Sequence, residues 1–305
     1  MPPAQQNARL QPYVAPFVRA LPVDLLQNLA CSFMPGLWSN VTAEGHPVSQ
    51  VVASLTGLPP GDELDSLVTK VLFTDMKNYC LTQAWMASGL NGVRTLVRCP
   101  DAEILGEMHR NHQPAIFVFS HFGPRYAIAP AFQSVGIPVG LFQGLIPPPL
   151  QRKDVEQFVA QLPGMEVFWI NDPKTIRAIH LKRAVERVQR GEMVAMAIDG
   201  GHGDVLADAE FFGHRIQVAR GPAVLARLTG APLIPITVTW DEGWSIEFRV
   251  HAPIVRPDVA PTGSGEFDLA LTDRAVRFFD EFLRKAPEQM RLDRIARLVS
   301  KPKVS

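Results

Sequence analysis

Short apolar runs alternate with amphipathic helical patterns from residue 115 onward, and this alternation limits the possible folds more than any other feature. Proline, glycine or polar residues bound each run, as is typical of buried strands. Strands that alternate with helices predict a mostly parallel sheet covered by helices on both faces. We therefore expect one α/β domain. Its expected strands are Ala115–Ser120, Val139–Gln143, Met165–Ile170, Met193–Ile198, Leu233–Trp240 and Ser245–His251.

Helical periodicity fills most of the intervals between these strands and also precedes the first of them. The expected helices cover residues 62–88, 101–110, 174–190, 217–228 and 273–285, and residues 11–40 read as helical with proline breaks. The tripeptide Asp241-Glu-Gly243 predicts a hairpin between the last two strands, so we expect a mixed sheet. Together these elements predict an N-terminal helical segment, residues 1–110, packed on an α/β core, residues 111–305, as one structural unit.

Composition argues against several classes of partner. The 30 Lys and Arg residues balance 30 Asp and Glu residues, so net charge gives no attraction to nucleic acid, which is not an expected partner. Three cysteines without CxxC spacing argue against a disulfide framework and against structural zinc. The sequence shows neither a signal-peptide pattern nor a run of about 18 apolar residues. We expect a cytoplasmic protein, with at most peripheral contact on the inner face of the cell membrane.

A histidine stands where the first of these strands ends, in Phe119-Ser-His-Phe-Gly-Pro-Arg-Tyr126. Ligands bind at the carboxyl edge of open α/β sheets, and an imidazole titrates near neutrality, so His121 is a candidate general base. The alternative is a histidine that only caps the turn. Ser120 is not its nucleophile, because neighbouring strand residues point to opposite faces and no GxSxG motif occurs.

Two further clusters follow the strands downstream. In Ile198-Asp-Gly-Gly-His-Gly-Asp204, Asp199 is expected at the same sheet edge as His121, and Gly200 allows close approach of a ligand. A metal bound by Asp199, His202, Asp204 and Asp208 is a weaker alternative, since their spacing matches no known ligand pattern. The third cluster holds Phe211, Phe212 and then Arg220; the paired phenylalanines either line an acyl pocket or belong to the core.

The order of these features resembles that of the bacterial lipid A biosynthesis acyltransferases, the lauroyl and myristoyl transferases of the lysophospholipid acyltransferase superfamily. Five pieces match in order over most of the chain. They are Phe119-Ser-His-Phe-Gly123 for "GHFGNWE", Ala197-Ile-Asp199 for the Asp-Gln strand end, Phe211-Phe-Gly213 for "FFG", residues 221–235 for "ALARLTGAPVVP", and Ala286-Pro-Glu-Gln289 for "PEQW". The resemblance implies a glycerolipid-acyltransferase-like fold and acyl transfer without a covalent enzyme intermediate.

In such an enzyme the histidine removes a proton from an acceptor hydroxyl or amine, which attacks the thioester of an acyl carrier protein or of coenzyme A. The resemblance thus makes His121 the base, and it implies an acidic residue five positions later that orients the imidazole. This chain has Tyr126 there, preceded by Arg125. A neutral phenol cannot stabilise an imidazolium as a carboxylate does, so we expect Asp199 to be the likeliest helper, with Tyr126 orienting the site.

Our leading hypothesis from the sequence is therefore an acyltransferase that needs no cofactor or metal and that acts outside lipid A, for example in a secondary-metabolite pathway. A non-catalytic relative that binds acyl carrier protein or a partner enzyme is the alternative, and a metal-dependent hydrolase is a weaker one. Expected substrate-binding residues are Gly123, Arg125, Gly200, Phe211, Phe212 and Arg220.

Overall fold

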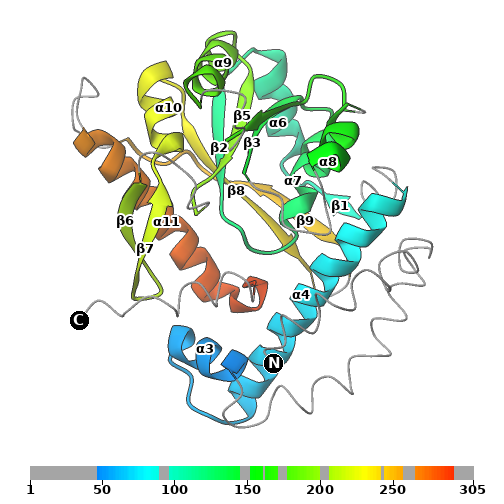
Figure 1. Cartoon of the computed structure of the whole chain (residues 1–305), viewed down its shortest axis with the longest axis vertical. Coiled ribbons are helices and arrows are strands. Elements are labelled where there is room, and N and C mark those ends of the chain that lie inside the picture. Colours follow the sequence, from blue (N-terminus) through cyan, green and yellow to red (C-terminus); the bar gives the residue numbers. More distant parts are fainter. Residues whose placement is uncertain are drawn as a thin grey trace.

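The computed structural model of the 305-residue chain is shown in Figure 1. It describes residues 47–88, 96–144, 152–160, 162–170, 177–199, 206–241, 244–256 and 265–291. The expected helical region at residues 11–40 lies outside these ranges. Within them, no helix is both long enough and apolar enough to cross a membrane.

A seven-stranded sheet forms the centre of the domain, with the strand order β1-β9-β8-β2-β5-β3-β4. Its strands are β1 (Val97–Arg98), β2 (Ala115–Phe119), β3 (Val139–Gln143), β4 (Glu166–Trp169), β5 (Met193–Ala197), β8 (Leu233–Trp240) and β9 (Ile246–Val250). Neighbouring strands are parallel except β8 and β9, which pair antiparallel. The predicted mixed, mostly parallel sheet is confirmed, and the six predicted strands are all present in it.

Helices cover both faces of this sheet and precede it in the chain (Figure 1). They are α3 (Pro47–Thr56), α4 (Asp62–Ser88), α6 (Ala102–Arg110), α7 (Ile128–Ser134), α8 (Arg152–Val159), α9 (Arg177–Gln189), α10 (Gly221–Thr229) and α11 (Gly265–Lys285), with the 3-10 turns η1 (Arg125–Ala127) and η2 (Pro287–Gln289). Two expected helix starts were wrong. Residues 217–219 belong to a strand, so α10 begins only at Gly221. The last helix begins at Gly265, earlier than residue 273, which was predicted from its apolar stripe.

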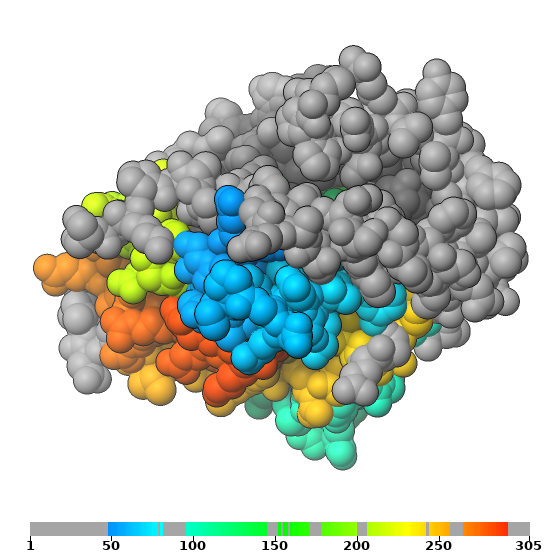
Figure 2. All heavy atoms as spheres, turned by 90° about the horizontal axis from the view of Figure 1, so that it is seen from below, coloured from blue at the N-terminus to red at the C-terminus, as the bar shows by residue number. Residues whose placement is uncertain are grey.

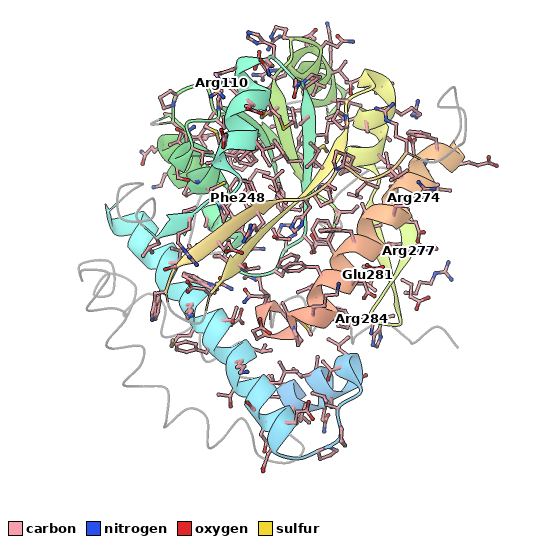
Figure 3. The ribbon with its side chains drawn as sticks, turned by 180° about the vertical axis from the view of Figure 1, so that it is seen from behind. Arg110, Phe248, Arg274, Arg277, Glu281 and Arg284 are labelled. Atoms are coloured by element: carbon pink, nitrogen blue, oxygen red, sulfur yellow. The ribbon has the colours of Figure 1, made fainter. Side chains whose placement is uncertain are left out.

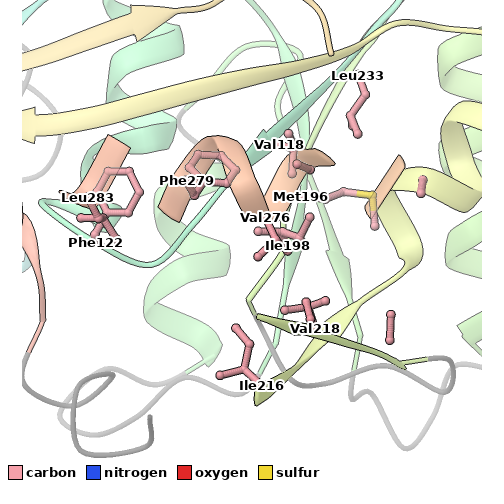
Figure 4. Packing of buried hydrophobic residues seen from close by; sticks show 14 of the residues in the cluster. Val118, Phe122, Met196, Ile198, Ile216, Val218, Leu233, Val276, Phe279 and Leu283 are labelled. Carbon is pink, nitrogen blue, oxygen red and sulfur yellow. The ribbon is translucent and has the colours of Figure 1, made fainter. Parts of the chain in front are cut away.

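The central strand β2 is buried on both faces, because its side chains alternate between two hydrophobic clusters. Ile116 and Val118 pack in the cluster that α9, α10 and α11 cover, and Figure 4 shows Val118 in this cluster together with Met196 and Phe279. Residues 115, 117 and 119 pack on the opposite face, which α6, α7 and α8 cover. Burial on both sides explains why β2 reads as a continuous apolar run in the sequence.

Helix α11 is amphipathic and closes one side of the molecule. Its buried stripe includes Phe279 and Leu283, whereas Arg274, Arg277 and Arg284 lie along its exposed side (Figure 3). Two of these arginines pair with an aspartate four residues before them on the same helix. Such exposed pairs contribute little to stability, so the packed stripe holds α11 in place.

A two-stranded antiparallel hairpin, β6 (Leu206–Phe211) and β7 (His214–Ala219), lies beside α11 and outside the main sheet (Figure 1). The sequence prediction missed this hairpin. In β6 and β7, buried and exposed positions alternate, and the short apolar residues Ala207, Ala209 and Val218 gave no continuous apolar run. The backbone of Ala219 at its end donates to the Ile198 carbonyl at 2.8 Å, which ties the hairpin to the end of β5.

The C-terminal turn η2 joins three parts of the structure through Gln289, a side chain that is only 4% exposed. Its amide group accepts from the Trp240 backbone N–H at 3.0 Å and donates to the Trp240 carbonyl at 2.9 Å. The backbone carbonyl of Gln289 accepts from the Gly123 N–H at 2.8 Å. The indole of Trp240 in turn donates to Asn78 of α4 at 2.9 Å. Figure 2 shows α3 and α4 packed against the C-terminal end of α11 and the turn that follows it.

This arrangement predicts a large stability effect for Gln289→Ala. Truncation leaves the buried N–H and carbonyl of Trp240 without their partners, and each orphaned group costs about 1–3 kcal/mol. We expect the free energy of unfolding in urea to fall by about 2–4 kcal/mol. Gln113→Ala, at an exposed glutamine, is the matched control and should change it by less than about 0.5 kcal/mol. Equal stabilities of the two variants would contradict this assignment.

Candidate active site

The candidate site lies where β2 and β5, two adjacent parallel strands, reach the carboxyl edge of the sheet. The last pair in register is Phe119 with Ala197, and Ile198 N–H donates to the Phe119 carbonyl at 2.9 Å just beyond it. Continuing this register by two residues sets His121 opposite Asp199. The pairing of the two strands therefore brings together two side chains that are 78 residues apart.

His121 and Asp199 make a close contact, with 2.6 Å between the imidazole Nδ1 and the carboxylate Oδ1. Their side chains are 18% and 19% exposed, so the pair is largely shielded from water and still reachable from the surface. A charge-assisted hydrogen bond of this length fixes the orientation of the ring. The ring of Phe119 meets that of His121 edge to face at 5.9 Å and supports one side of it.

The second oxygen of Asp199 is also engaged. Oδ2 accepts from the Ser120 hydroxyl at 2.9 Å and from the His121 backbone N–H at 2.8 Å. Three donors thus hold one carboxylate in a defined rotamer. Hydrogen bonds to the charged form of a carboxylate favour that form.

This pattern also determines where the imidazole carries its proton. An ionised carboxylate can only accept hydrogen bonds, so with Asp199 ionised Nδ1 of His121 is the donor to Oδ1. In the neutral ring the lone pair then lies on Nε2, which can accept a proton from a bound molecule. The structure brings His121 and Asp199 together, as the sequence predicted, in a geometry that suits a general base held by an acid. Their catalytic roles stay predictions.

The turn after His121 is held tightly. Gly123 has φ +51°, and a Cβ there would collide with the Val238 carbonyl of β8, so only glycine fits the conformation and the space. Phe122 stacks on Phe282 of α11 with ring centroids 5.3 Å apart. Together with the bond from Gly123 to Gln289, these contacts fix the backbone on both sides of His121. A substrate-binding role for Gly123 stays a prediction.

Tyr126 and Arg125 form a unit in the turn η1. The Arg125 guanidinium donates to the Tyr126 hydroxyl at 2.8 Å and lies over its ring, 4.7 Å from the centroid. Tyr126 is partly buried and packs against the cluster under α7. The structure thus places a cation and a phenol at the position where the resemblance implied an acid. Their expected roles at the site stay predictions.

The structure fixes the packing of Phe211 and Phe212 in the β6–β7 hairpin. Phe212 is 5% exposed and has φ +52°, and its backbone N–H donates to Asp280 of α11 at 2.6 Å. Arg284 lies over the Phe212 ring, and Phe211 packs edge to face on it. These contacts place Phe212 in the core and connect the hairpin to α11. A role of the pair in lining an acyl pocket stays a prediction.

Arg220 follows β7, and its side chain turns toward α11. It donates to the Gly265 carbonyl at 3.0 Å and to the carboxylate of Asp268 at 3.4 Å, and Arg227 binds the same carboxylate at 2.8 Å. Asp268 is 3% exposed, so the two arginines compensate a buried charge. The structure therefore gives Arg220 a structural partner, and substrate binding by it stays a prediction.

The described part of the chain also bears on two other chemistries, catalysis by a cysteine nucleophile and catalysis by a bound metal. Burial raises the pKa of the Cys99 thiol to about 11, so at neutral pH it is a poor nucleophile. The residues for a metal site, His202 and Asp204, and the expected ligand contact Gly200 all lie outside the described ranges. Inside them, no three His, Cys, Asp or Glu side chains are grouped as a metal would require.

Sequence reasoning missed two residues of this site. Ser120 was set aside because it cannot act on His121, yet its hydroxyl reaches the carboxylate that His121 uses. Gln289 was noted only as part of a motif, although it binds the turn that carries His121. A polar residue at a strand end and a glutamine in the C-terminal turn were the available signals, and neither specifies a partner.

Fold and site together define an α/β protein with a histidine–carboxylate pair at the open edge of a mixed sheet. A family model for bacterial lipid A biosynthesis acyltransferases matches residues 83–292, more than half of the chain. The chain therefore belongs to this family, as the order of its motifs predicted. No curated protein matches the sequence.

The contacts of Asp199 predict the effect of Asp199→Asn on His121. The amide oxygen must replace Oδ2 to accept from the Ser120 hydroxyl and the His121 backbone N–H, so the amide NH₂ faces Nδ1. We expect the ring proton to move to Nε2, so that this nitrogen can no longer accept a proton from a bound molecule. The ¹⁵N chemical shifts of the His121 ring, measured at a pH where the ring is neutral, report the tautomer.

Asp208→Asn, at an exposed carboxylate of β6 that pairs with Arg215, is the matched control and should leave the His121 signals unchanged. Retention of the Nδ1 proton in Asp199→Asn would contradict the hydrogen-bond pattern assigned to this site.

Proposed function

We propose that this protein transfers an acyl group from an acyl-carrier-protein or coenzyme A thioester to a hydroxyl or amine acceptor, with His121 as the general base. The observation that carries the proposal is the 2.6 Å contact between His121 Nδ1 and Asp199, at the ligand-binding edge of the sheet in a member of an acyltransferase family. The contact supplies an oriented base of the kind that the reaction needs.

In the proposed reaction the acceptor O–H or N–H gives its proton to Nε2 of His121 while its oxygen or nitrogen attacks the thioester carbon. The resulting tetrahedral intermediate carries a negative oxygen. It collapses with cleavage of the carbon–sulfur bond, and the leaving thiolate takes the proton back from His121. No bond forms between enzyme and acyl group, and the described cysteines, of which Cys80 is buried and Cys99 weakly acidic, offer no competing nucleophile.

Asp199 has two tasks in this scheme. It keeps the proton of the neutral ring on Nδ1, and it stabilises the imidazolium that forms when Nε2 accepts the acceptor's proton. We propose that Asp199 thereby replaces the acidic residue that the family motif carries at the position of Tyr126. A carboxylate 2.6 Å from the ring can do this work whichever strand or helix supplies it.

The remaining residues at this edge contribute to binding in our proposal. Arg125, held against Tyr126, supplies positive charge near the turn for the negative oxygen or for a phosphate of the donor. The acceptor is proposed to lie outside lipid A, because Tyr126 and Gly200 replace the acid and the glutamine of the family motifs. The reaction is proposed for the cytoplasm or the inner face of the cell membrane.

A non-catalytic relative would be expected to have lost the acid or to have closed the site. Here His121 is in contact with Asp199, and both side chains keep a fifth of their surface exposed. Both observations favour a working base over a binding remnant.

His121→Ala tests the proposal directly. We expect the rate of acyl transfer from acyl-carrier-protein or acyl-coenzyme A thioesters to fall by about 10²–10⁴-fold, the usual contribution of a general base. Transfer is followed by intact mass spectrometry of a panel of hydroxyl and amine acceptors. His109→Ala, at an exposed histidine of α6, is the matched control and should keep full activity.

Undiminished turnover by His121→Ala would refute the proposed function. The binding alternative replaces the proposed function if the wild-type chain transfers no acyl group and if the wild type and His121→Ala bind carrier protein with equal affinity.

A further inference from the structure

The hydroxyl of Ser120 binds Asp199, but the proposed reaction assigns it no role. Its Oγ donates to Oδ2 of Asp199 at 2.9 Å, while His121 takes the other oxygen of the same carboxylate. Ser120 is 7% exposed, so water has little access to replace this bond. The serine hydroxyl and the imidazole thus bind different oxygens of one carboxylate.

The carboxylate of an aspartate can rotate about its χ2 torsion, whose observed angles are broadly distributed with two-fold symmetry. The short contact with Nδ1 requires that Oδ1 stay in the plane of the imidazole. Two donors on Oδ2, the Ser120 hydroxyl and the His121 N–H, restrict this rotation. Of these two, only the hydroxyl belongs to a side chain that can be changed without altering the backbone.

The strand geometry explains why serine can do this. Ser120 and His121 follow directly after β2, and Asp199 follows the end of the neighbouring strand β5, so both side chains reach the same carboxylate. The motif that this segment resembles has glycine at the position of Ser120 and an acid at the position of Tyr126. This chain has a hydroxyl at the first position and no acid at the second, so the serine accompanies the change of carboxylate.

We propose that Ser120 is a positioning residue that locks the Asp199 carboxylate against His121 and thereby sets the efficiency of the base. The inference rests on the proposed function. Ser120 itself exchanges no atoms with the substrate, and the covalent chemistry is that given for His121.

Ser120→Ala removes one oxygen and introduces no clash, and Ser120→Thr keeps the hydroxyl. For Ser120→Ala we expect kcat to fall about 10-fold, the effect of losing a hydrogen bond to a charged group, with the KM for the thioester unchanged. We also expect the downfield Nδ1 proton signal of His121 to weaken and its exchange with solvent to accelerate about 10-fold. Ser120→Thr should restore both the rate and the signal.

Ser134→Ala is the matched control, because the Ser134 hydroxyl makes a 2.7 Å bond to a backbone carbonyl of α7 and touches no carboxylate. A serine that only stabilises the fold would lower the melting temperature and leave kcat and the His121 proton signal as in the wild type, and that result would overturn the proposal.

The two proposals fail in distinguishable ways. An unchanged proton signal in Ser120→Ala, together with a strong rate loss in His121→Ala, rejects the positioning role and keeps the proposed function. A changed signal in Ser120→Ala, together with full activity in His121→Ala, keeps the geometric role of Ser120 and rejects His121 as the base. Because the signal is read on the folded protein without substrate, it does not depend on knowing the acceptor.

Discussion

Parallel pairing of β2 with β5 is the constraint on which the rest of the site depends. Both strands are buried on two faces by apolar side chains, so a slip of one residue would expose a full set of core positions on each side. The register is thereby fixed, and it continues past the last paired residues to set His121 opposite Asp199. The packing energy of the core, spread over many residues, thus determines one 2.6 Å contact.

The source of the carboxylate distinguishes this chain from the motif that it resembles. An acid five residues after the histidine sits on the following helix and depends on the turn between them for its position. Asp199 instead lies two residues after the end of the neighbouring strand β5, whose pairing with β2 positions it. The turn carries Arg125 and Tyr126, which bind each other. Gly123 and Phe122 still anchor that turn, to β8 and α11 respectively.

The sequence predicted the parts of this structure that burial imposes. The central strands β2, β5 and β8 are buried on both faces and therefore appear as apolar runs, and His121 and Asp199 follow two of these runs closely. The β6–β7 hairpin escaped prediction because its exposed face interrupts the apolar pattern, and β1 is only two residues long. Ser120 and Gln289 could not be assigned because their partners, 79 and 49 residues away, are defined only by tertiary contact.

The bond from Gly123 to Gln289 has a consequence for the order in which the protein becomes competent during synthesis. The segment with His121 leaves the ribosome well before residue 289 does, and until then the Gly123 N–H and the end of β8 lack the groups that bind them. The sheet can assemble from β2, β5 and β8, but the turn after the histidine acquires its final support only when the C-terminal turn docks. Docking of η2 therefore acts as the last step in building the site.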